Sequence, residues 1–382
     1  MSNVVIVDAV RTAIGRKNGS LKDIHPIDLL TPILQQLIKR NPVKCEQIED
    51  VITGCATMTG DQGVNIGRMA VLAAGFPVEV PAYSLNRLCG SSQQAIHNAS
   101  QAIASGDMDI VIACGVESMS RVPMGSDMGE MPDSLTEKHA IIPQGISAEQ
   151  IAAHWEIERK ALDNYSLLSH QRAVEAIDEG YFEREIIPVE VGVNGEKRQF
   201  LEDEGARRDT NREKLASLTT SFMPDGGTVT AGNSSQISDG AAGLLLMSEE
   251  KANELGIKAR AKVIARTVVG EDPVMMLTGV IPATKKVLEK AGLTIDDMDV
   301  IEINEAFASV VKAWEKEIKP DMRKVNPRGG AIALGHPLGA SGTRLATTLL
   351  HTLEDYKGRY GLQVMCIGFG MATATIYENL SS

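Results

Sequence analysis

Short apolar runs alternate with longer helical patterns at both ends of the chain. The runs at residues 3–7, 110–114 and 362–367 have the length and composition of buried strands. Strands that alternate with helical stretches are typical of βα units, which predicts a buried, largely parallel sheet. Residues 95–104 are rich in small side chains, and this predicts a helix that is packed on several sides rather than lying on the surface.

The same landmarks occur twice, in the same order, along the chain. The matched pairs are 7–15 with 263–270, 50–54 with 299–303, and Cys89 to Cys114 with Ser341 to Cys366. The last two spacings are both 25 residues. Three repeated landmarks predict two related halves, and the alternative is a chance similarity of short strand-and-glycine patterns.

The residues between the two halves have a different character. They begin with an irregular stretch punctuated by methionine and glycine, which is typical of a loop. Ser147 and Gln150 fit a capping box and predict that a helix begins there. We interpret this region as an insertion that covers a site between the halves. The predicted division is 1–116 plus 237–262 for the first half, 117–236 for the inserted loop domain, and 263–382 for the second half.

The charge balance argues against whole classes of partner. Thirty-eight basic and 50 acidic residues give a net charge of −12, which disfavours nucleic-acid and membrane-surface binding. No apolar run approaches the roughly 20 residues of a membrane span, and the N-terminus shows no signal-peptide pattern. With 43% hydrophobic residues a large packed core is expected, and we predict a cytoplasmic protein.

Cysteine and histidine usage argues against metals and disulfides. The five cysteines are sparse and odd in number, and the seven histidines are scattered. Neither a dinucleotide-binding fingerprint nor a P-loop is present. We therefore expect no metal and no permanently bound cofactor.

Cys89 is the first candidate for chemistry. It stands directly before Gly90, Ser91 and a helical pattern. The positive end of a helix dipole and its unpaired N–H groups favour a thiolate, and Arg87 adds a nearby positive charge. The alternative is a small buried hydrophobic residue, which is what most free cysteines are.

Three further segments carry candidate groups. His336 lies in the stretch 326–342, where five of seventeen residues are glycine, which indicates an imidazole held among tight turns. Cys366 ends an apolar strand, and the N–H of Gly368 beyond it could bind a ligand oxygen, whereas by itself the segment favours a strand-terminal cysteine before a turn. Asn304 follows another apolar strand, where its amide either points into a cleft or caps a helix.

Together these segments resemble the thiolases, the acyl-CoA:acyl-CoA C-acyltransferases, over essentially the whole chain. The resemblance rests on residues 11–16, 85–92, 230–235, 238–242, 304–308, 335–342 and 366–368. It implies the α/β thiolase fold, in which two duplicated βα halves form a layered αβαβα arrangement with an inserted loop domain. This agrees with the duplication and the insertion inferred above.

The resemblance also implies a mechanism for cleaving a 3-ketoacyl-CoA. The Cys89 thiolate would attack the 3-keto carbon while His336 assists its deprotonation. Cys366 would protonate the departing acetyl-CoA enolate and later deprotonate free CoA. The N–H groups of Cys89 and Gly368 would hold the acyl oxygen, and His336 with a water held by Asn304 would hold the enolate oxygen.

The family's contacts with its co-substrate, coenzyme A, map onto a further set of residues. Arg207 matches a position near the nucleotide end of CoA, and Ser235 matches a pantetheine contact. Leu218 and Phe222 match apolar contacts, and Phe307 is expected to line the acyl end. The pair Arg207–Arg208 suits a phosphate-rich ligand, although a solvated surface pair is an equal interpretation for Arg208.

Departures from the family pattern bear on substrate and assembly. Short-chain biosynthetic thiolases carry a histidine–methionine pair at the position of residues 142–147, and this chain lacks the histidine. Those enzymes also have a long tetramer-forming segment, which is shortened in this chain around residues 124–137. Both points favour a β-oxidation-type 3-ketoacyl-CoA thiolase that forms a homodimer. Association with a hydratase/dehydrogenase partner in a β-oxidation complex is compatible with this assignment. Ala372 stands where glycine is commoner. The alternatives are a biosynthetic acetoacetyl-CoA thiolase, a non-catalytic acyl-CoA-binding protein of this fold, and a decarboxylating ketosynthase.

Overall fold

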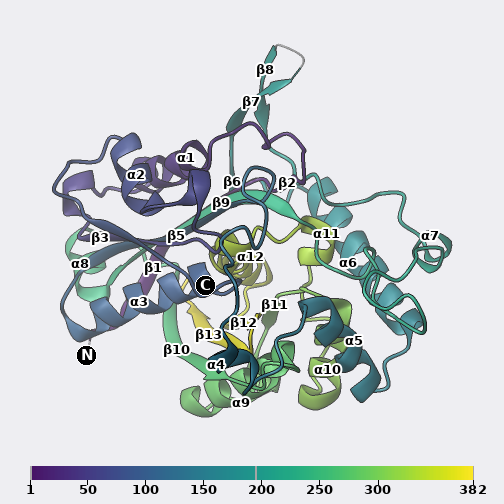
Figure 1. Ribbon diagram of the computed structural model, residues 1–382. Helices are drawn as coiled ribbons and strands as arrows, with labels where there is room; N and C mark the ends of the chain where they lie inside the picture. The colour runs from purple at the N-terminus through teal and green to yellow at the C-terminus, as the bar shows by residue number, and fades with distance from the viewer. Residues whose placement is uncertain (1, 194–195, 382) are drawn as a thin grey trace.

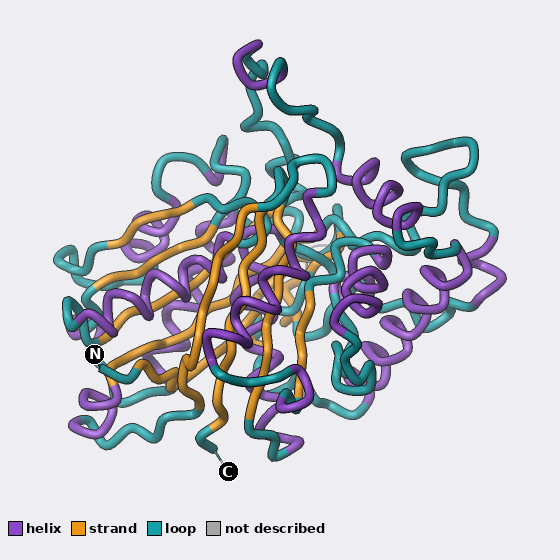
Figure 2. The backbone as a smooth tube through the Cα atoms, turned by 90° about the horizontal axis from the view of Figure 1, so that it is seen from below, coloured by secondary structure: helices purple, strands orange, loops and turns teal. Residues whose placement is uncertain are grey.

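Eleven strands form one sheet in the computed structural model, which describes residues 2–193 and 196–381. The path through the sheet is β11-β12-β13-β10-β1-β9-β5-β3-β4, with β2 beside β9 and β6 beside β1. Figure 2 shows these strands crossing the molecule with helices on either side. The strands are β1 (Val4–Thr12), β2 (Gly15–Arg16), β3 (Asp50–Gly54), β4 (Ala82–Leu85), β5 (Ile110–Ser118), β6 (Ile186–Ile187), β9 (Ser238–Ser248), β10 (Ala261–Gly270), β11 (Val300–Ile303), β12 (Tyr360–Ile367) and β13 (Met371–Asn379).

The strand order repeats, as the duplicated sequence pattern predicts. In the first half β3 pairs parallel with β5, and β5, β9 and β1 then follow antiparallel. In the second half β11 pairs parallel with β12, and β12, β13 and β10 follow antiparallel. The two halves join where β1 pairs with β10. The prediction of a largely parallel sheet is therefore wrong, because each half returns through two antiparallel strands whose apolar runs look the same in sequence.

Helices cover both faces of each half and complete five layers. The helices α1 (Pro26–Lys39) and α2 (Ile66–Ala73) pack on the outer face of the first half, and α9 (Val280–Ala291) and α10 (Ala308–Ile318) pack on the outer side of the second. Between the halves lie α3 (Ser91–Ser105) and α12 (Ser341–Tyr356), whose apolar residues share one core cluster. The short helix α8 (Glu249–Glu254) follows β9. The result is the αβαβα arrangement implied by the thiolase resemblance.

The central helix α12 is buried from Ser341 to Leu353 although many of its residues are polar. Threonine side chains return hydrogen bonds to the helix itself, as Thr347 Oγ1 does to Thr343 O at 2.8 Å and Thr352 Oγ1 to Thr348 O at 2.7 Å. These bonds satisfy hydroxyl groups that would otherwise be unpaired in the interior. A polar helix can therefore form the middle layer.

The N-termini of α3 and α12 meet at very short range. A Cβ on Gly342 would lie 2.1 Å from the backbone nitrogen of Gln93, so only glycine fits there. Thr343 N donates to Ser92 Oγ at 3.0 Å. This crossing brings the loops that precede the two helices, and with them Cys89 and His336, to one place.

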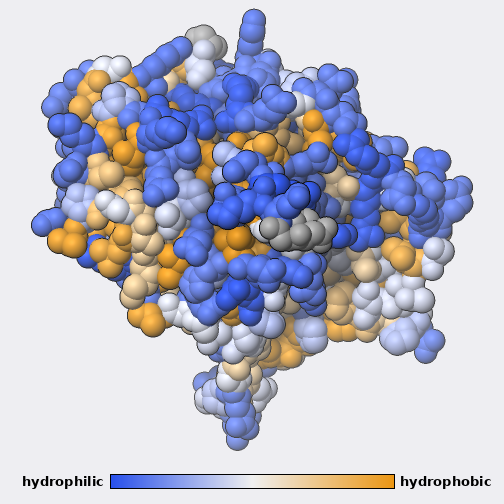
Figure 3. All heavy atoms as spheres, turned by 90° about the horizontal axis from the view of Figure 1, so that it is seen from above, coloured by the Kyte–Doolittle hydropathy of each residue, from blue (hydrophilic) through white to orange (hydrophobic). Residues whose placement is uncertain are grey.

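The insertion lies mostly beside the second half (Figure 1). Its elements are α4 (Asp133–Thr136), α5 (Gln144–His154), α6 (Arg159–Asp178), the hairpin β7 (Val189–Val193) with β8 (Glu196–Phe200), and α7 (Arg212–Ala216). The hairpin projects from the face shown in Figure 3, which is mostly hydrophilic. The predicted capping box at Ser147 is wrong, because α5 begins three residues earlier with Pro143 at its N-cap and buries Ser147 inside the helix.

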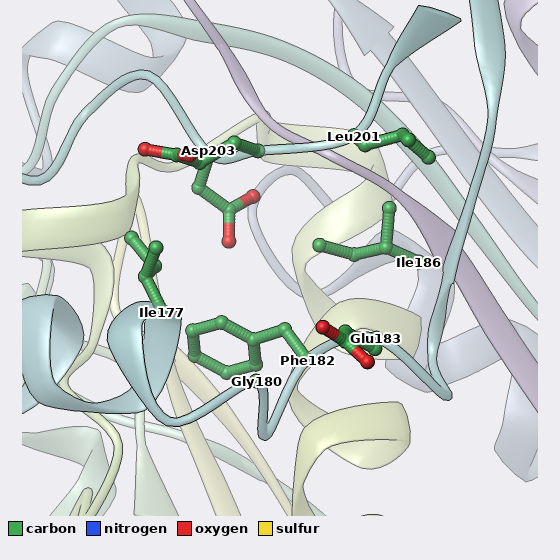
Figure 4. Close-up of a pocket in the computed structure, with 8 residues that line it drawn as sticks. Ile177, Gly180, Phe182, Glu183, Ile186, Leu201 and Asp203 are labelled. Carbon is green, nitrogen blue, oxygen red and sulfur yellow. The ribbon is translucent and has the colours of Figure 1, made fainter.

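A buried ion-pair cluster fastens the insertion to β1. Arg11 Nε donates to Glu185 at 2.6 Å, and its Nη atoms donate to Asp203 at 2.7 and 2.9 Å. Beside this cluster lies a cavity of about 370 Å³ lined mainly by the apolar residues Ile177, Phe182, Ile186 and Leu201 and by acidic side chains (Figure 4). None of its lining residues is a cysteine or histidine, so this cavity is not the candidate active site.

No described helix is both long and apolar enough to cross a membrane.

Candidate active site

A cavity of about 200 Å³ lies where the two halves and the insertion meet. Six of the ten predicted site residues line it, and these are Cys89, His336, Cys366, Phe222, Ser235 and Phe307. The other lining residues are Met119, Met124, Gln144, Ser234, Gln236, Ile237, Leu277, Ala306 and Leu338. The cavity is therefore mostly apolar, with two thiols and one imidazole at its inner end.

The nucleophile candidate is held by its own loop. Asn86 Oδ1 accepts from the backbone nitrogen of Leu88 at 2.7 Å, and Leu88 adopts a left-handed conformation with φ of 48°. Gly90 caps α3, and a Cβ there would lie 2.3 Å from Ile367 Cδ1. Cys89 is thus fixed immediately before the helix, with only 6% of its surface exposed.

Burial keeps Cys89 protonated in the free site. Desolvation raises the pKa of the Cys89 thiol to about 11, although the backbone N–H of Gly368 and the side chain of Gln144 face the sulfur and lower that pKa. The negative charge of Glu117 raises it further. The prediction of a helix-stabilised thiolate is therefore wrong, because the thiol lies in an interior where loss of water outweighs the dipole.

His336 has a defined tautomer. Asn304 Nδ2 faces Nε2 at 3.2 Å, and because an amide nitrogen only donates, Nε2 is assigned as the acceptor and Nδ1 as the protonated nitrogen. Nδ1 then donates to Ser341 Oγ at 2.6 Å, and that hydroxyl lies 2.8 Å from Pro337 O. Burial and then the positive charge of Arg344 lower the pKa of His336 to about 3, so the ring is neutral at physiological pH.

Asn304 connects the imidazole with the second thiol. Its side-chain amide also faces Cys366 and lowers the pKa of that thiol, while burial and Cys89 raise it well above its usual range. The backbone nitrogen of Asn304 donates to Val364 O at 3.0 Å and fixes it to the next strand. Since α10 begins at Ala308, Asn304 does not cap that helix, and its amide points into the site.

Gly368 completes the inner wall in the turn between β12 and β13. A Cβ on this glycine would lie 2.7 Å from Gln144 Nε2, so the missing side chain lets the amide approach. The next two residues, Phe369 and Gly370, both have positive φ and close the turn. Ala372, where the family more often has glycine, is buried and pairs in register with Cys366, so alanine fits this strand.

A second cavity of about 290 Å³ adjoins the first and shares Gln236 with it. It contains two of the predicted CoA contacts, Arg207 and Leu218, together with Lys214. Phe222 lines the first cavity with 38% of its surface exposed, and its ring meets that of Phe307 edge to face at 6.1 Å. The predicted contacts thus follow a path from basic surface residues to the inner thiols.

Several residues at the site carried little signal in the sequence. Arg208 pairs with Asp178 at 2.7 Å on the surface, which favours the interpretation as a solvated pair. Lys214 and Gln144 belong to the two cavities but were not predicted, although Gln144 lies in the stretch noted for lacking a histidine. Glu117 carried no sequence signal of a role at the site, because it is a single carboxylate at the end of an apolar strand.

The described residues contain no group of three or more side chains placed to hold a metal ion.

Comparisons with known proteins agree along the whole chain. The family models for the thiolase N-terminal and C-terminal domains match residues 4–250 and 257–379. The steroid 3-ketoacyl-CoA thiolase FadA6 of Mycobacterium tuberculosis is 48% identical, covering 100% of this chain and 95% of that protein. A 3-ketoacyl-CoA thiolase of Aliivibrio fischeri is 47% identical, covering 99% and 100%.

Two crystal structures are closely similar to the fold. The Bacillus anthracis acetyl-CoA acetyltransferase superposes with a TM-score of 0.93 at 40% identity, covering 100% of this chain and 99% of that one. Human mitochondrial 3-ketoacyl-CoA thiolase superposes with a TM-score of 0.91 at 37% identity, covering 99% of each. With both domains matched and the cysteine–histidine–cysteine cavity in place, the chain belongs to the thiolase family of acyltransferases.

Proposed function

We propose that the protein is a 3-ketoacyl-CoA thiolase, which uses free CoA to cleave a 3-ketoacyl-CoA into acetyl-CoA and an acyl-CoA shortened by two carbons. The observation that carries this proposal is one apolar cavity that holds Cys89, Cys366 and His336 and adjoins a basic path. The names of the relatives from Mycobacterium tuberculosis and Aliivibrio fischeri support it.

In the first half-reaction the Cys89 sulfur attacks the 3-keto carbon as its proton passes to His336 Nε2. A protonated thiol and a neutral imidazole are the forms that this step needs, and both are favoured by burial. The transfer becomes favourable together with the attack, because negative charge then develops on the substrate oxygen instead of remaining on sulfur. The N–H groups of Cys89 and Gly368 are the proposed donors to that oxygen.

Breaking the bond between C2 and C3 leaves the acyl group on Cys89 and releases the acetyl-CoA enolate, which Cys366 protonates. His336 and a water held by Asn304 are the proposed donors that stabilise the enolate oxygen, and the two side chains lie 3.2 Å apart. Asn304 Oδ1 is buried and has no partner among the described residues, so it is available to hold the water expected there.

In the second half-reaction Cys366 takes the proton of free CoA, the CoA sulfur attacks the acyl carbon, and the departing Cys89 sulfur recovers its proton from His336. We propose that Arg207 contacts the nucleotide end of CoA, that Leu218 and Phe222 flank it, and that Ser235 contacts pantetheine. Phe307, at the inner end of the path, is the proposed acyl contact. CoA is in this scheme a co-substrate, and no permanently bound cofactor takes part.

A second candidate function is the synthesis of acetoacetyl-CoA by the same residues. The similarity to the Bacillus anthracis acetyl-CoA acetyltransferase favours it. The experiment that separates the two is CoA-dependent cleavage of 3-ketoacyl-CoA substrates of four to sixteen carbons, with Cys89→Ala as the control. Turnover of medium and long chains supports the cleavage enzyme, and turnover of the four-carbon substrate alone supports the synthetic one. If no substrate reacts faster than with Cys89→Ala, the proposal fails.

We also propose a cytoplasmic homodimer. Within the described part of the chain the edge strand β4 pairs with β3 alone, and an open edge is a template for a second copy. Next to it Met69, Leu72, Val78 and Tyr83 expose 42, 42, 69 and 37% of their surfaces. Such an apolar margin beside an open edge suits a self-complementary interface. A hydratase/dehydrogenase partner remains compatible with the function.

The domain division that we propose is 1–116 plus 237–262, 117–236, and 263–382. Its support is that β5 ends at Ser118 and β9 begins at Ser238, so the insertion leaves the first half between these two paired strands. The last boundary falls just inside β10, which begins at Ala261.

A further inference from the structure

A fully buried carboxylate stands between the loops that carry the two catalytic candidates. Glu117 is 0% exposed, and no described arginine or lysine forms an ion pair with it. Instead it accepts four hydrogen bonds. Oε2 accepts from the backbone nitrogens of Ala56 at 2.8 Å and Gly339 at 2.7 Å, and Oε1 accepts from Thr57 N at 3.1 Å and Gln62 Nε2 at 2.7 Å.

One side of this cluster leads to the nucleophile. Ala56 donates its N–H to Glu117, and its carbonyl accepts from Asn86 Nδ2 at 2.8 Å. Asn86 Oδ1 accepts from Leu88 N at 2.7 Å, which supports the left-handed conformation just before Cys89. A continuous series of hydrogen bonds therefore runs from Glu117 to the residue that precedes the thiol.

The other side leads to the base. Gly339 lies in the turn between His336 and Ser341. Ser341 Oγ is the hydrogen-bond partner of His336 Nδ1. A Cβ on Gly339 would lie 2.6 Å from Cys55 Cα and 2.7 Å from Glu117 Oε2, so this turn is pressed against the first half. Since Glu117 and Gly339 are 222 residues apart, this bond joins the two halves at the catalytic loops.

Burial raises the pKa of Glu117, and its four hydrogen bonds oppose that shift, because they are formed fully only with an ionised carboxylate. All four partners are N–H donors, and a carboxylate can accept from all of them because it has two oxygens and no hydrogen. A glutamine would turn an NH₂ group toward two of these donors. The negative charge itself works against thiolate formation at Cys89, because it raises the pKa of that thiol. The benefit of Glu117 to the reaction therefore has to be geometric.

We propose that Glu117 is a positioning residue for the thiolase reaction, holding the Cys89 loop and the His336 loop in register across the junction of the two halves. This inference rests on the proposed function for its turnover readout. Displacing a catalytic group by about 1 Å typically lowers turnover by about 100-fold, and this sets the expected size of the effect.

The test compares Glu117→Gln with the wild-type protein in two assays. The first measures kcat and KM for cleavage of a 3-ketoacyl-CoA, and the second measures alkylation of Cys89 by iodoacetamide as a function of pH. We expect kcat to fall about 100-fold with KM for CoA changed by less than about threefold, because the CoA path lies elsewhere. We also expect the alkylation midpoint to move to lower pH, because a negative charge has been removed.

A matched control is Glu149→Gln. Glu149 is also a buried carboxylate that accepts three hydrogen bonds, from Thr228 N and Oγ1 at 2.8 Å and Val229 N at 2.9 Å, all within the insertion. We expect the Glu149→Gln variant to be less stable to heat than the wild-type protein, while its kcat falls by less than about threefold. Equal losses of kcat in the two variants, or a wild-type kcat in Glu117→Gln, would overturn the proposal.

A second variant covers the case in which Glu117→Gln does not fold. Gln62→Met removes one of the four donors to Glu117, together with the bonds of Gln62 with Thr57 O and Ser118 N, and we expect kcat to fall about three- to tenfold with the alkylation midpoint unchanged. An unchanged kcat in this variant counts against the proposal. Alkylation of Cys89 needs no thiolase substrate, so a wild-type protein that alkylates normally but cleaves nothing would contradict the proposed function and not the hydrogen-bond geometry.

Discussion

Replacing Ser341 by alanine isolates the hydrogen bond that sets the tautomer of His336. The substitution removes one oxygen and leaves the buried Nδ1–H without the acceptor that now lies 2.6 Å away. An unpaired buried donor costs about 1–3 kcal/mol. Nε2 has to be unprotonated to take the Cys89 proton, so molecules with the other His336 tautomer are inactive. The cost of the unpaired Nδ1–H therefore appears as an equal loss of transition-state stabilisation.

At about 1.4 kcal/mol per factor of ten, this cost corresponds to a fall of roughly 5- to 150-fold in kcat/KM. The assay is CoA-dependent cleavage of a 3-ketoacyl-CoA, with thermal unfolding measured in parallel. Ser309→Ala is the matched control, because Ser309 is equally buried and its hydroxyl has no partner among the described residues. We expect the control to stay within about twofold of wild type. A Ser341→Ala enzyme that is equally active would refute the tautomer argument.

Three other outcomes follow from the buried groups. Because burial raises the pKa of Cys89 to about 11, alkylation by iodoacetamide should still be accelerating above pH 9, and a plateau below pH 8.5 contradicts this. Gln144→Met removes a group that lowers this pKa and should slow alkylation at pH 8 by about threefold or more, whereas Gln150→Met on the exposed face of α5 should not. Burial lowers the pKa of His97, which lies 2.8 Å from Thr375 Oγ1, to about 3, so the unfolded chain binds the additional proton and stability falls as pH drops below about 6.5. His97→Gln should remove about 2 kcal/mol of the stability lost between pH 6.5 and 4.5, as measured by urea unfolding, and an unchanged pH dependence would show that the unfolded state does not bind that proton.

The candidate site was predictable where chemistry and local pattern coincide. Cys89 directly precedes Gly90 and a helix, His336 lies in a glycine-rich stretch before another helix, and the structure brings both to one cavity with Cys366. The duplication was predictable for a similar reason, because each half needs the same apolar strands and small residues to build the same layers. Asn304 could not be decided between cleft and helix cap, since that depends on where α10 begins.

The errors have a common physical origin. A thiolate at Cys89 was inferred from the helix that follows, but the pKa of a thiol depends on all the atoms that exclude water from it, and these come from distant segments. The largely parallel sheet was inferred from apolar runs, and a run buried on both faces looks the same in parallel and antiparallel strands. The helix start at Ser147 followed a local motif that packing of the insertion overrode.

The sequence by itself determined the family, the duplicated α/β layers and the identity of the reactive side chains, because these depend on residue type and on short-range pattern. Only the tertiary structure decided their protonation states, the tautomer of His336, the approach of Gln144 to the thiol and the four hydrogen bonds of Glu117. Desolvation and hydrogen bonding act through space between residues far apart in the sequence, such as Glu117 and Gly339 at 222 positions, and no local pattern in the chain records them.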